Sequence, residues 1–414
     1  MPKLLVGLCL GLLAGLAAAA DPAPDWRAAW SVSPSSVRNM NRFAASQTIR
    51  QIVRVSAAGN SLRLRFGQRY GLDTVQLTAV SVGLRAEGAS IAPGSLRSVT
   101  FGGSRSLSLA PGASISSDPV ALPVAAFQDL VISVSGSGAL GQVTEHYIAR
   151  ETPYISTAAN AVDQLDDGGF RRSPAGTPDA FYVLEAVDVQ PSTATRTLIA
   201  LGDSISDGYI SALGSPFIQN TAGLGLNERY PDVLAQRLAQ RFPGRYSVVN
   251  AGISGNRVTA AAFLPQYGPS LLDRLDDDVL AVPGVSDVIL LEGGNDLGFA
   301  IRPDADALIA GLSQAVTRLK TAGLRVLLGT LLPSRGAFNG ALHGRPTVDT
   351  ARQAVNNWIR NQQLADGIVD FDACIRDPAR PGFLRPDLDS GDNLHPNAAG
   401  YQALAACVTL DLLD

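Results

Sequence analysis

Two motifs in the second half of the chain carry the side chains of a nucleophilic serine and its base. Ser204 follows Gly202 and Asp203, and His395 stands three residues after Asp392. A serine hydroxyl becomes a competent nucleophile when a histidine takes its proton, and a carboxylate can hold that histidine in the required orientation. In this half of the chain, only His395 has a carboxylate three residues upstream. We therefore predict Ser204 as the nucleophile, His395 as the base and Asp392 as the group that orients the base.

Two further motifs offer hydrogen-bond donors for a developing oxyanion. Gly252 lies in the segment 250–256 (NAGISGN), and Asn295 lies in the segment 293–296 (GGND). A glycine lets the backbone come close to a ligand so that its N–H can donate, and an asparagine amide can donate beside it. Each of the four motifs alone also fits an ordinary turn or helix cap. The four motifs indicate a catalytic site because they occur together, each at the end of a predicted element.

Apolar runs alternate with helical patterns from residue 198 onward. A continuous apolar run predicts a strand buried on both faces at 198–201, and further strands are predicted at 246–249, 288–291, 325–328 and 368–371. Helical spacing predicts helices at 230–242, 304–322, 348–362 and 396–413. This alternation predicts a parallel sheet with helices on both faces. Ligand sites in such folds lie beyond the carboxyl ends of the strands, where the motifs fall.

The first half of the chain is predicted to be all β. Short strand-like runs occupy 61–66, 74–83, 96–101 and 130–134, and turns rich in Gly, Pro and Ser separate them. Many short strands without a helical pattern predict an antiparallel sandwich or jelly roll over 25–190. The polar segment 189–197 contains one proline and predicts a linker to a second domain, 197–414.

The four motifs together resemble the conserved blocks of the SGNH (GDSL-type) hydrolase superfamily, in the family's order. Ser204 matches the serine of block I, and Gly252 matches the glycine of block II. Asn295 matches the asparagine of block III, and Asp392 with His395 matches block V. The resemblance covers the second domain and implies a three-layer α/β/α sandwich with a parallel sheet. The chain has no G-x-S-x-G elbow, which argues against an ordinary α/β-hydrolase.

The resemblance implies a serine esterase that hydrolyses carboxylic esters through an acyl-enzyme on Ser204, without a metal or an organic cofactor. The backbone N–H groups of Ser204 and Gly252 and the amide of Asn295 would hold the oxyanion. The runner-up activity is that of a lipase or lysophospholipase, which an exposed apolar rim would favour, whereas an open polar cleft would favour a sugar ester. A non-catalytic carbohydrate-binding protein on a hydrolase fold, and acyl transfer to a sugar hydroxyl, stay as alternatives.

Segments 48–54 (TIRQIVR) and 116–120 (SSDPV) resemble the β-domain that precedes some secreted bacterial SGNH esterases. Some members of that subgroup are grouped with xylan-associated arylesterases and acetylesterases. The resemblance therefore favours a plant-polysaccharide ester, or a small acyl or aryl ester, as the substrate partner. The alternative is that the β-domain is a structural partner without a ligand.

The amino-terminal residues have the pattern of a signal peptide. Lys3 precedes the apolar stretch 4–16, which is too short to span a bilayer, and Ala18, Ala19 and Ala20 offer a cleavage site. We expect removal of residues 1–20 and a secreted or periplasmic protein, with a retained membrane anchor as the alternative. No other segment predicts stable membrane insertion. A net charge of −4 on 414 residues gives no reason to expect nucleic acid or an anionic membrane as a partner.

Two cysteines and one further histidine complete the predicted site. Cys374 and Cys407 are the cysteines left after signal removal, and an exported protein favours a disulfide between them, with two buried thiols as the alternative. We expect Cys374 to end the fifth strand and the bridge to support the loop that leads into His395. His343 follows the fourth strand, so we expect it to contact substrate or to act in a lid; the alternative is a solvent-exposed loop histidine.

Overall fold

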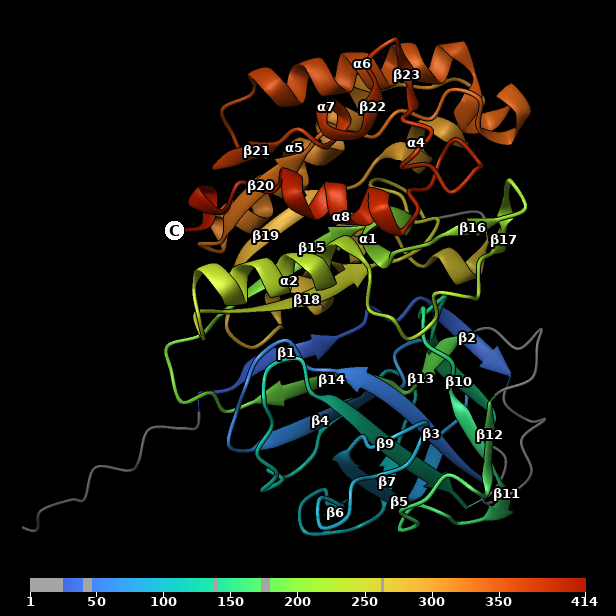
Figure 1. The fold of residues 1–414 in the computed structure, drawn as a ribbon, viewed down its shortest axis with the longest axis vertical. Coiled ribbons are helices and arrows are strands. Elements are labelled where there is room, and N and C mark those ends of the chain that lie inside the picture. The colour runs from blue at the N-terminus through green and yellow to red at the C-terminus, as the bar shows by residue number, and fades with distance from the viewer. Residues whose placement is uncertain (1–24, 40–46, 138–139, 173–178, 262–263) are drawn as a thin grey trace, which may run out of the picture.

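The computed structural model describes residues 25–39, 47–137, 140–172, 179–261 and 264–414. The predicted signal peptide, residues 1–20, lies outside the described residues. Figure 1 shows the chain as a β-rich part, in blue and green, that lies against a part in which helices surround a sheet. In the described residues, no helix is long and apolar enough to cross a membrane.

The β-rich part consists of fourteen strands among the described residues, all paired antiparallel. They are β1 (Arg27–Ser31), β2 (Ser36–Asn39), β3 (Gln47–Arg54), β4 (Leu62–Gly67), β5 (Val75–Leu84), β6 (Arg97–Val99), β7 (Leu107–Leu109), β8 (Ser114–Ser116), β9 (Asp129–Gly136), β10 (Gln142–Tyr147), β11 (Tyr154–Ala159), β12 (Phe170–Arg172), β13 (Ala180–Tyr182) and β14 (Leu184–Val189). The sheets run in the orders β1-β14-β4-β8, β13-β10-β2 and β12-β11-β3-β9-β5-β6, and β7 also pairs with β5.

Alternation of polar and apolar residues explains how these sheets pack. In β4, Leu62, Leu64 and Phe66 are fully buried, whereas Arg63 and Arg65 between them are half-buried. Their side chains share one hydrophobic core with apolar residues of β3, β5, β9 and β14. An all-β region is therefore present in the first half of the chain, as the sequence predicts.

The second part is built on a five-stranded parallel sheet. Its strands are β15 (Arg196–Gly202), β18 (Tyr246–Gly252), β19 (Val285–Leu291), β20 (Arg325–Gly329) and β21 (Gly367–Val369), in the order β18-β15-β19-β20-β21. Two antiparallel hairpins project from it: β16 (Ser211–Ala212) with β17 (Ser215–Gln219), and β22 (Arg376–Asp377) with β23 (Arg380–Leu384). The parallel sheet is confirmed, with each of its strands at a position that the sequence predicts.

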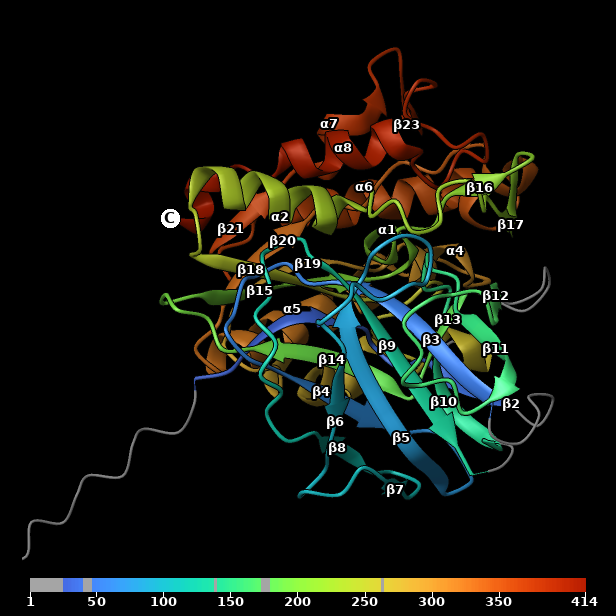
Figure 2. The same cartoon turned by 60° about the horizontal axis from the view of Figure 1, so that its bottom comes forward.

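Helices cover both faces of this sheet (Figures 1 and 2). Ile199 and Leu201 of β15 pack into one core, and Leu198 and Ala200 pack into another on the opposite face. The first core includes α3 (Leu271–Leu275), α5 (Ala305–Thr321) and α6 (Pro346–Asn361). The second includes α2 (Tyr230–Arg241), α7 (Phe371–Ile375) and α8 (Ala398–Cys407). Short helices α1 (Ser204–Asp207) and α4 (Gly294–Gly298) follow β15 and β19.

Two predicted boundaries are wrong, both near the end of the chain. The fifth strand ends at Val369, because Asp370 accepts a hydrogen bond from the Ala373 N–H and starts α7, so Cys374 lies in a helix and does not end the strand. The last predicted helix stops at Cys407, and a separate 3₁₀ turn covers Leu410–Leu413.

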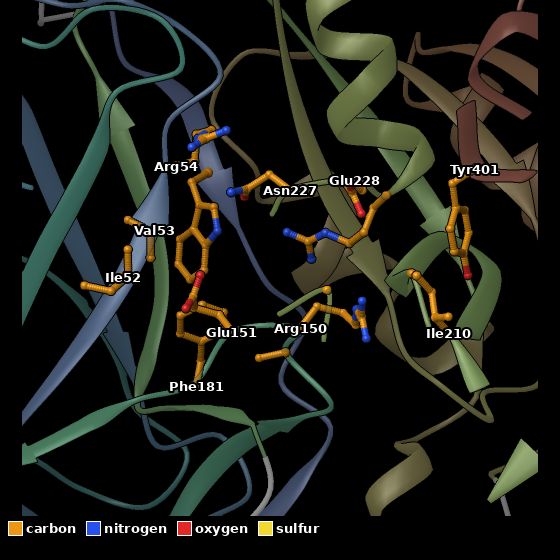
Figure 3. A pocket seen from close by; sticks show the side chains of 15 residues that line it. Ile52, Val53, Arg54, Arg150, Glu151, Phe181, Ile210, Asn227, Glu228 and Tyr401 are labelled. Atoms are coloured by element: carbon orange, nitrogen blue, oxygen red, sulfur yellow. The ribbon is translucent and has the colours of Figure 1, made fainter. Parts of the chain in front are cut away.

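The two parts contact each other along a continuous boundary. The Ala28 N–H donates to the Pro283 carbonyl at 3.1 Å, and the Ser247 hydroxyl donates to the Ala28 carbonyl at 2.7 Å. Figure 3 shows a charged cleft at this boundary, where Arg54 and Glu151 of the β-rich part face residues of the second part. Burial raises the pKa of Glu151 to about 7.

Candidate active site

Ser204 stands at the carboxyl end of β15, a central strand of the parallel sheet. Asp203 caps α1, since its carboxylate accepts the Ile205 N–H at 2.9 Å, and α1 begins at Ser204 itself. Gly208 ends the helix at φ +89°, where an added Cβ would lie 2.1 Å from the Arg229 side chain. The strand–turn–helix path therefore places the Ser204 side chain at the edge of the sheet.

Ser204, His395 and Asp392 form a hydrogen-bonded chain. Ser204 Oγ lies 3.0 Å from His395 Nε2, and His395 Nδ1 lies 2.7 Å from Asp392 Oδ2. Because a carboxylate accepts, Nδ1 carries the proton, which leaves Nε2 free to accept from the serine. Burial alone would raise the pKa of Asp392, but its hydrogen bond to His395 and the charge of His395 outweigh burial and hold this pKa below its usual value. Asp392 therefore stays ionised.

Backbone groups hold this carboxylate in place. Asp392 Oδ1 accepts from the N–H groups of Leu394 and His395 at 2.9 and 2.8 Å. The next residue, Asn393, has φ +59°, so the chain turns sharply between the aspartate and the histidine. The spacing of three residues is thus set by a tight turn that folds the carboxylate back onto the ring.

Asn295 lies near Ser204, at the start of α4. Its side chain is buried, and Nδ2 donates to the Asn256 carbonyl at 2.9 Å. Nδ2 also lies 3.5 Å from Asp203 Oδ2, a distance beyond the usual range for an N–H···O bond. Asn295, Ser204 and His395 line one common cleft. The structure therefore brings these three predicted site residues together.

Gly252 does not fit the role that the sequence analysis gave it. Its N–H donates to the Asn250 side chain at 2.8 Å, and it is paired with Gly202 as the last residue of β18, outside the cleft that contains Ser204. An added Cβ would lie 2.3 Å from the Asp207 nitrogen, so this glycine lets α1 pack against the strand.

Gly255, in the same motif, is the glycine that lines the cleft. It has φ +80°, and an added Cβ would lie 2.4 Å from the Tyr267 ring. The motif holds two glycines. Because β18 extends through Gly252, the loop begins after it, and Gly255 is the glycine of this motif that reaches the cleft.

His343 is buried and is not a solvent-exposed loop histidine. It lies in a 3₁₀ turn, Leu342–Gly344, and is 2 % exposed. Its Nε2 is 3.0 Å from Asn295 Oδ1. Burial lowers its pKa to about 3. The segment after the fourth strand thus reaches the site, as predicted, with its histidine directed at Asn295.

The cleft around Ser204 has a volume of about 680 Å³ and exposes both apolar and polar surface. Its aromatic lining residues are Tyr147, Tyr209, Phe217, Tyr267, Phe299 and Phe338. Tyr209 lies beside the His395 ring, with centroids 4.6 Å apart. Sequence analysis missed all of these aromatic residues, because none stands in a motif and most come from segments between the predicted elements.

The β-rich part contributes to the same cleft. Tyr147, Ile148 and Asp179 line it together with residues of the second part. Asp179 accepts hydrogen bonds from the Arg150 N–H at 2.9 Å and from Gln219 Nε2 at 3.0 Å, which ties the β16–β17 hairpin to the β-rich part. Burial raises the pKa of Asp179 to about 6. The cleft is therefore built by both parts of the chain.

The structure also shows whether the two cysteines are paired and whether a metal-binding group of side chains is present. Cys374 and Cys407 form the predicted disulfide, which joins α7 to α8 with a Cα–Cα distance of 6.3 Å. Within the ranges that the structure describes, no group of three or more His, Cys, Asp or Glu side chains could hold a metal ion.

Comparison with known proteins assigns the second part of the chain to a family. Residues 200–403 match the model of the GDSL-like lipase/acylhydrolase family. The chain is thus a member of the SGNH (GDSL-type) hydrolase superfamily through these residues, and an acylhydrolase by class. No curated protein sequence matches the chain.

Several solved structures are similar to parts of this chain at low sequence identity. A carbohydrate acetylesterase from Sinorhizobium meliloti is 16 % identical over 53 % of this chain and 100 % of its own, with a TM-score of 0.41. The M. smegmatis aryl esterase is 16 % identical over 52 % of this chain and 96 % of its own, with a TM-score of 0.40. A family two carbohydrate esterase from Clostridium thermocellum is 13 % identical over 91 % of this chain and 98 % of its own, with a TM-score of 0.39.

Proposed function

We propose that this protein is a serine esterase that hydrolyses carboxylic esters through an acyl-enzyme on Ser204. The observation that carries the proposal is the chain from Ser204 Oγ to His395 Nε2 at 3.0 Å and from His395 Nδ1 to Asp392 Oδ2 at 2.7 Å. His395 takes the serine proton as Oγ attacks the ester carbonyl, and it then gives that proton to the leaving alkoxide. Water, deprotonated by His395, attacks the acyl-enzyme and releases the acid and free Ser204.

Three donors are proposed to hold the oxyanion. The Ser204 N–H lies in the first turn of α1, where backbone N–H groups lack partners within the helix. Gly255, which lines the cleft, replaces Gly252 as the second backbone donor. The Asn295 Nδ2 group is the third, because only one of its hydrogens has a partner at an ordinary hydrogen-bond distance. No step in this scheme requires a metal or an organic cofactor.

The cleft supports an ester with a bulky apolar group. A volume of about 680 Å³ is far more than an acetyl group needs and is in the range of sites for larger ligands. Aromatic side chains on several sides favour an aryl or alkyl group over a strongly hydrated one. Polysaccharide deacetylation therefore has less support from this geometry than hydrolysis of an aryl or medium-chain acyl ester.

A lipase-like activity is the second candidate, and one specific observation favours it. Phe217 and Ile218 of the β17 strand line the cleft, yet they are 70 % and 44 % exposed. Leu213, at the tip of the same hairpin, is 90 % exposed. This apolar rim beside the cleft would suit an alkyl chain or a lipid surface.

The division of the chain into domains, and the compartment of the protein, are also part of the proposal. We propose a signal peptide over residues 1–20, a β-sandwich domain over 25–190 and a three-layer α/β/α catalytic domain over 197–414, in a secreted or periplasmic protein. The strand β14 ends at Val189 and β15 begins at Arg196, which supports a boundary between these positions. The disulfide supports an oxidising compartment.

Replacement of the nucleophile tests the proposed function. Ser204→Ala should lower kcat for p-nitrophenyl acetate by about 10⁶-fold, as for loss of other triad nucleophiles. Ser98→Ala, at an exposed position of β6, is the matched control and should keep full activity. Intact-mass measurement after reaction with a fluorophosphonate should show one adduct on the wild type and none on Ser204→Ala. A Ser204→Ala protein with more than a few per cent of wild-type activity would overturn the assignment.

A further inference from the structure

The amide of Asn295 must point one particular way to act as a donor. The oxygen and nitrogen of an asparagine amide have nearly the same shape, so packing alone does not choose between the two orientations. Here two contacts determine the orientation of the amide: Nδ2 is 2.9 Å from the Asn256 carbonyl, and Oδ1 is 3.0 Å from His343 Nε2. A carbonyl only accepts, so the nitrogen of the amide faces Asn256 and the oxygen faces His343.

The protonation state of His343 follows from the same contacts. Because Asn295 Oδ1 accepts, His343 Nε2 must carry the hydrogen of that bond. Nδ1 of His343 is buried and has no hydrogen-bond partner among the described residues, so it is best left without a proton. Burial also lowers the pKa of His343 to about 3, which keeps the ring neutral. His343 is therefore a neutral donor that does not titrate at working pH.

Three neighbours hold the His343 ring in its position. Phe338 stacks on it with centroids 5.3 Å apart, and Phe299 meets it edge-on at 4.7 Å. Gly298, in the same helix as Asn295, leaves room for the ring, because a Cβ there would lie 2.1 Å from His343 Cδ2. Packing by these three neighbours therefore holds the His343 ring in one orientation, in addition to its hydrogen bond to Asn295.

We infer that His343 is a positioning residue, which locks the Asn295 amide with its N–H group turned toward the oxyanion of the transition state. A flipped amide would present its oxygen to the oxyanion and would repel it. This inference rests on the proposed function of Asn295 as an oxyanion donor. His343 also lines the cleft, so contact with substrate stays a prediction, but a ring that is 2 % exposed with its Nε2 directed at Asn295 favours positioning of the amide.

Two substitutions at His343 separate the hydrogen bond from the shape of the ring. His343→Phe keeps an aromatic ring between Phe299 and Phe338 but removes the donor, and it should lower kcat for p-nitrophenyl acetate by about 10–100-fold, as for loss of other groups that orient a reacting group. KM should change less than about threefold, because the substrate does not bind to His343 before the transition state. His343→Gln can place an N–H near Nε2 and should recover most of kcat. Thermal unfolding of both variants shows whether the fold is kept.

A double-mutant cycle with Asn295 tests whether His343 affects kcat through the Asn295 amide. Asn295→Ala should lower kcat by about 10²–10³-fold, and adding His343→Phe to it should cost little more, because His343 acts only through the amide. Full activity of His343→Phe, equal losses in the Phe and Gln variants, or additive losses in the double variant would each overturn the inference. If Asn295→Ala itself keeps wild-type kcat, the oxyanion role of Asn295 fails, and the inference fails with it, while the Ser204 test still stands alone.

Discussion

At the scale of single residues, the site depends on which ring nitrogen of His395 holds a proton. Asp392 accepts hydrogen bonds with both of its oxygens: Oδ1 accepts two backbone N–H groups and, at 3.4 Å, the Ser390 hydroxyl, and Oδ2 accepts His395 Nδ1–H. The two backbone hydrogen bonds hold the turn, and the hydrogen bond from His395 Nδ1 sets the tautomer of the ring. One carboxylate therefore performs a structural task and an electrostatic task with different oxygens, and substitution can separate them.

Asp392→Asn should separate the two tasks. The asparagine oxygen can still accept the N–H groups of Leu394 and His395, so the turn should be kept. The amide nitrogen would face Nδ1 and donate to it, which moves the ring proton to Nε2 and prevents it from accepting the serine proton. We expect kcat to fall by about 10³–10⁴-fold with a small change in KM. Steady-state kinetics and circular dichroism check this, and a kcat above about a tenth of the wild type would contradict it.

At the scale of elements, α8 separates the disulfide from His395, the proposed base. Cys407 ends this 10-residue helix, whereas His395 precedes its first turn, and a helix of this length spans roughly 15 Å. The turn around His395 has its own bonds: the Ser390 N–H donates to the His395 carbonyl at 2.9 Å, and the Asn397 N–H donates to the Leu388 carbonyl at 2.8 Å. The bridge therefore ties the ends of a longer segment, and the turn is held locally.

Loss of the bridge should thus affect stability more than catalysis. The disulfide closes a segment with a sequence separation of 33, for which the chain-entropy model gives a stabilisation of about 3–4 kcal/mol. Cys374→Ser should lower the free energy of unfolding by about this amount in non-reducing denaturant titrations. Its kcat at a temperature where it is folded should stay within about twofold of the wild type. Cys374→Ser/Cys407→Ser is the matched control, and a large fall in kcat in both would show that the bridge positions His395 after all.

At the scale of the whole molecule, a buried histidine joins the two parts near the site. His146 of β10 lies 3.1 Å from Asp207 Oδ1 through Nε2, and 2.7 Å from the Ser33 carbonyl through Nδ1. Both partners only accept, so the ring holds two protons and forms an ion pair with Asp207. The other oxygen of Asp207 accepts from the N–H and the hydroxyl of Ser254 at 3.0 and 2.7 Å. Ser254 directly precedes Gly255, so the β-rich part reaches the proposed oxyanion loop through two residues.

This pair predicts a dependence of stability on pH. Burial alone would lower the pKa of His146, and the charge of Arg229 adds slightly to that; the charge and hydrogen bond of Asp207 and the Ser33 carbonyl outweigh both and raise it above 6.5. A raised folded-state pKa stabilises the protein fully below pH 6.5, and this contribution is lost as the pH rises through the folded-state pKa.

His146→Ala should therefore cost most in acid. At about pH 6 it should lower the free energy of unfolding by about 3–5 kcal/mol, because it leaves Asp207 without its buried partner. The difference from the wild type should narrow as the pH rises toward about 9. Denaturant titrations across this range measure it, with His146→Gln as a variant that keeps one donor. A difference that is constant with pH would show that His146 is neutral in the folded protein.

The β-rich part should also influence which esters are hydrolysed. Tyr147→Ala removes an aromatic wall of the cleft, and such contacts contribute about 0.5–1.5 kcal/mol, or roughly 3–10-fold in kcat/KM for a benzoyl ester. The value for an acetyl ester should stay within about twofold. Leu72→Ala, at a position of the β-rich part that is 66 % exposed and does not line the cleft, is the control. Equal losses for both esters would contradict a role in selectivity.

The sequence by itself determined the periodic features of this protein. Short, mostly apolar runs identified all five strands of the parallel sheet, because strands buried on both faces need apolar residues at most positions. Alternation identified the all-β first half, because one face of each such strand is buried. The sequence also predicts Ser204, Asp392 and His395 as a nucleophile, its base and its carboxylate from their chemical types and order, and the structure brings the three side chains into one hydrogen-bonded chain.

Tertiary structure alone decided what depends on contacts between distant segments. The choice between Gly252 and Gly255 depended on where β18 stops pairing with β15, which the apolar pattern does not mark. The role of His343 depended on a residue 48 positions away in the chain. The contribution of Tyr147 depended on how the β-rich part lies against the sheet. Local periodicity reflects the burial of one element, whereas a cleft is lined by side chains that only packing brings together.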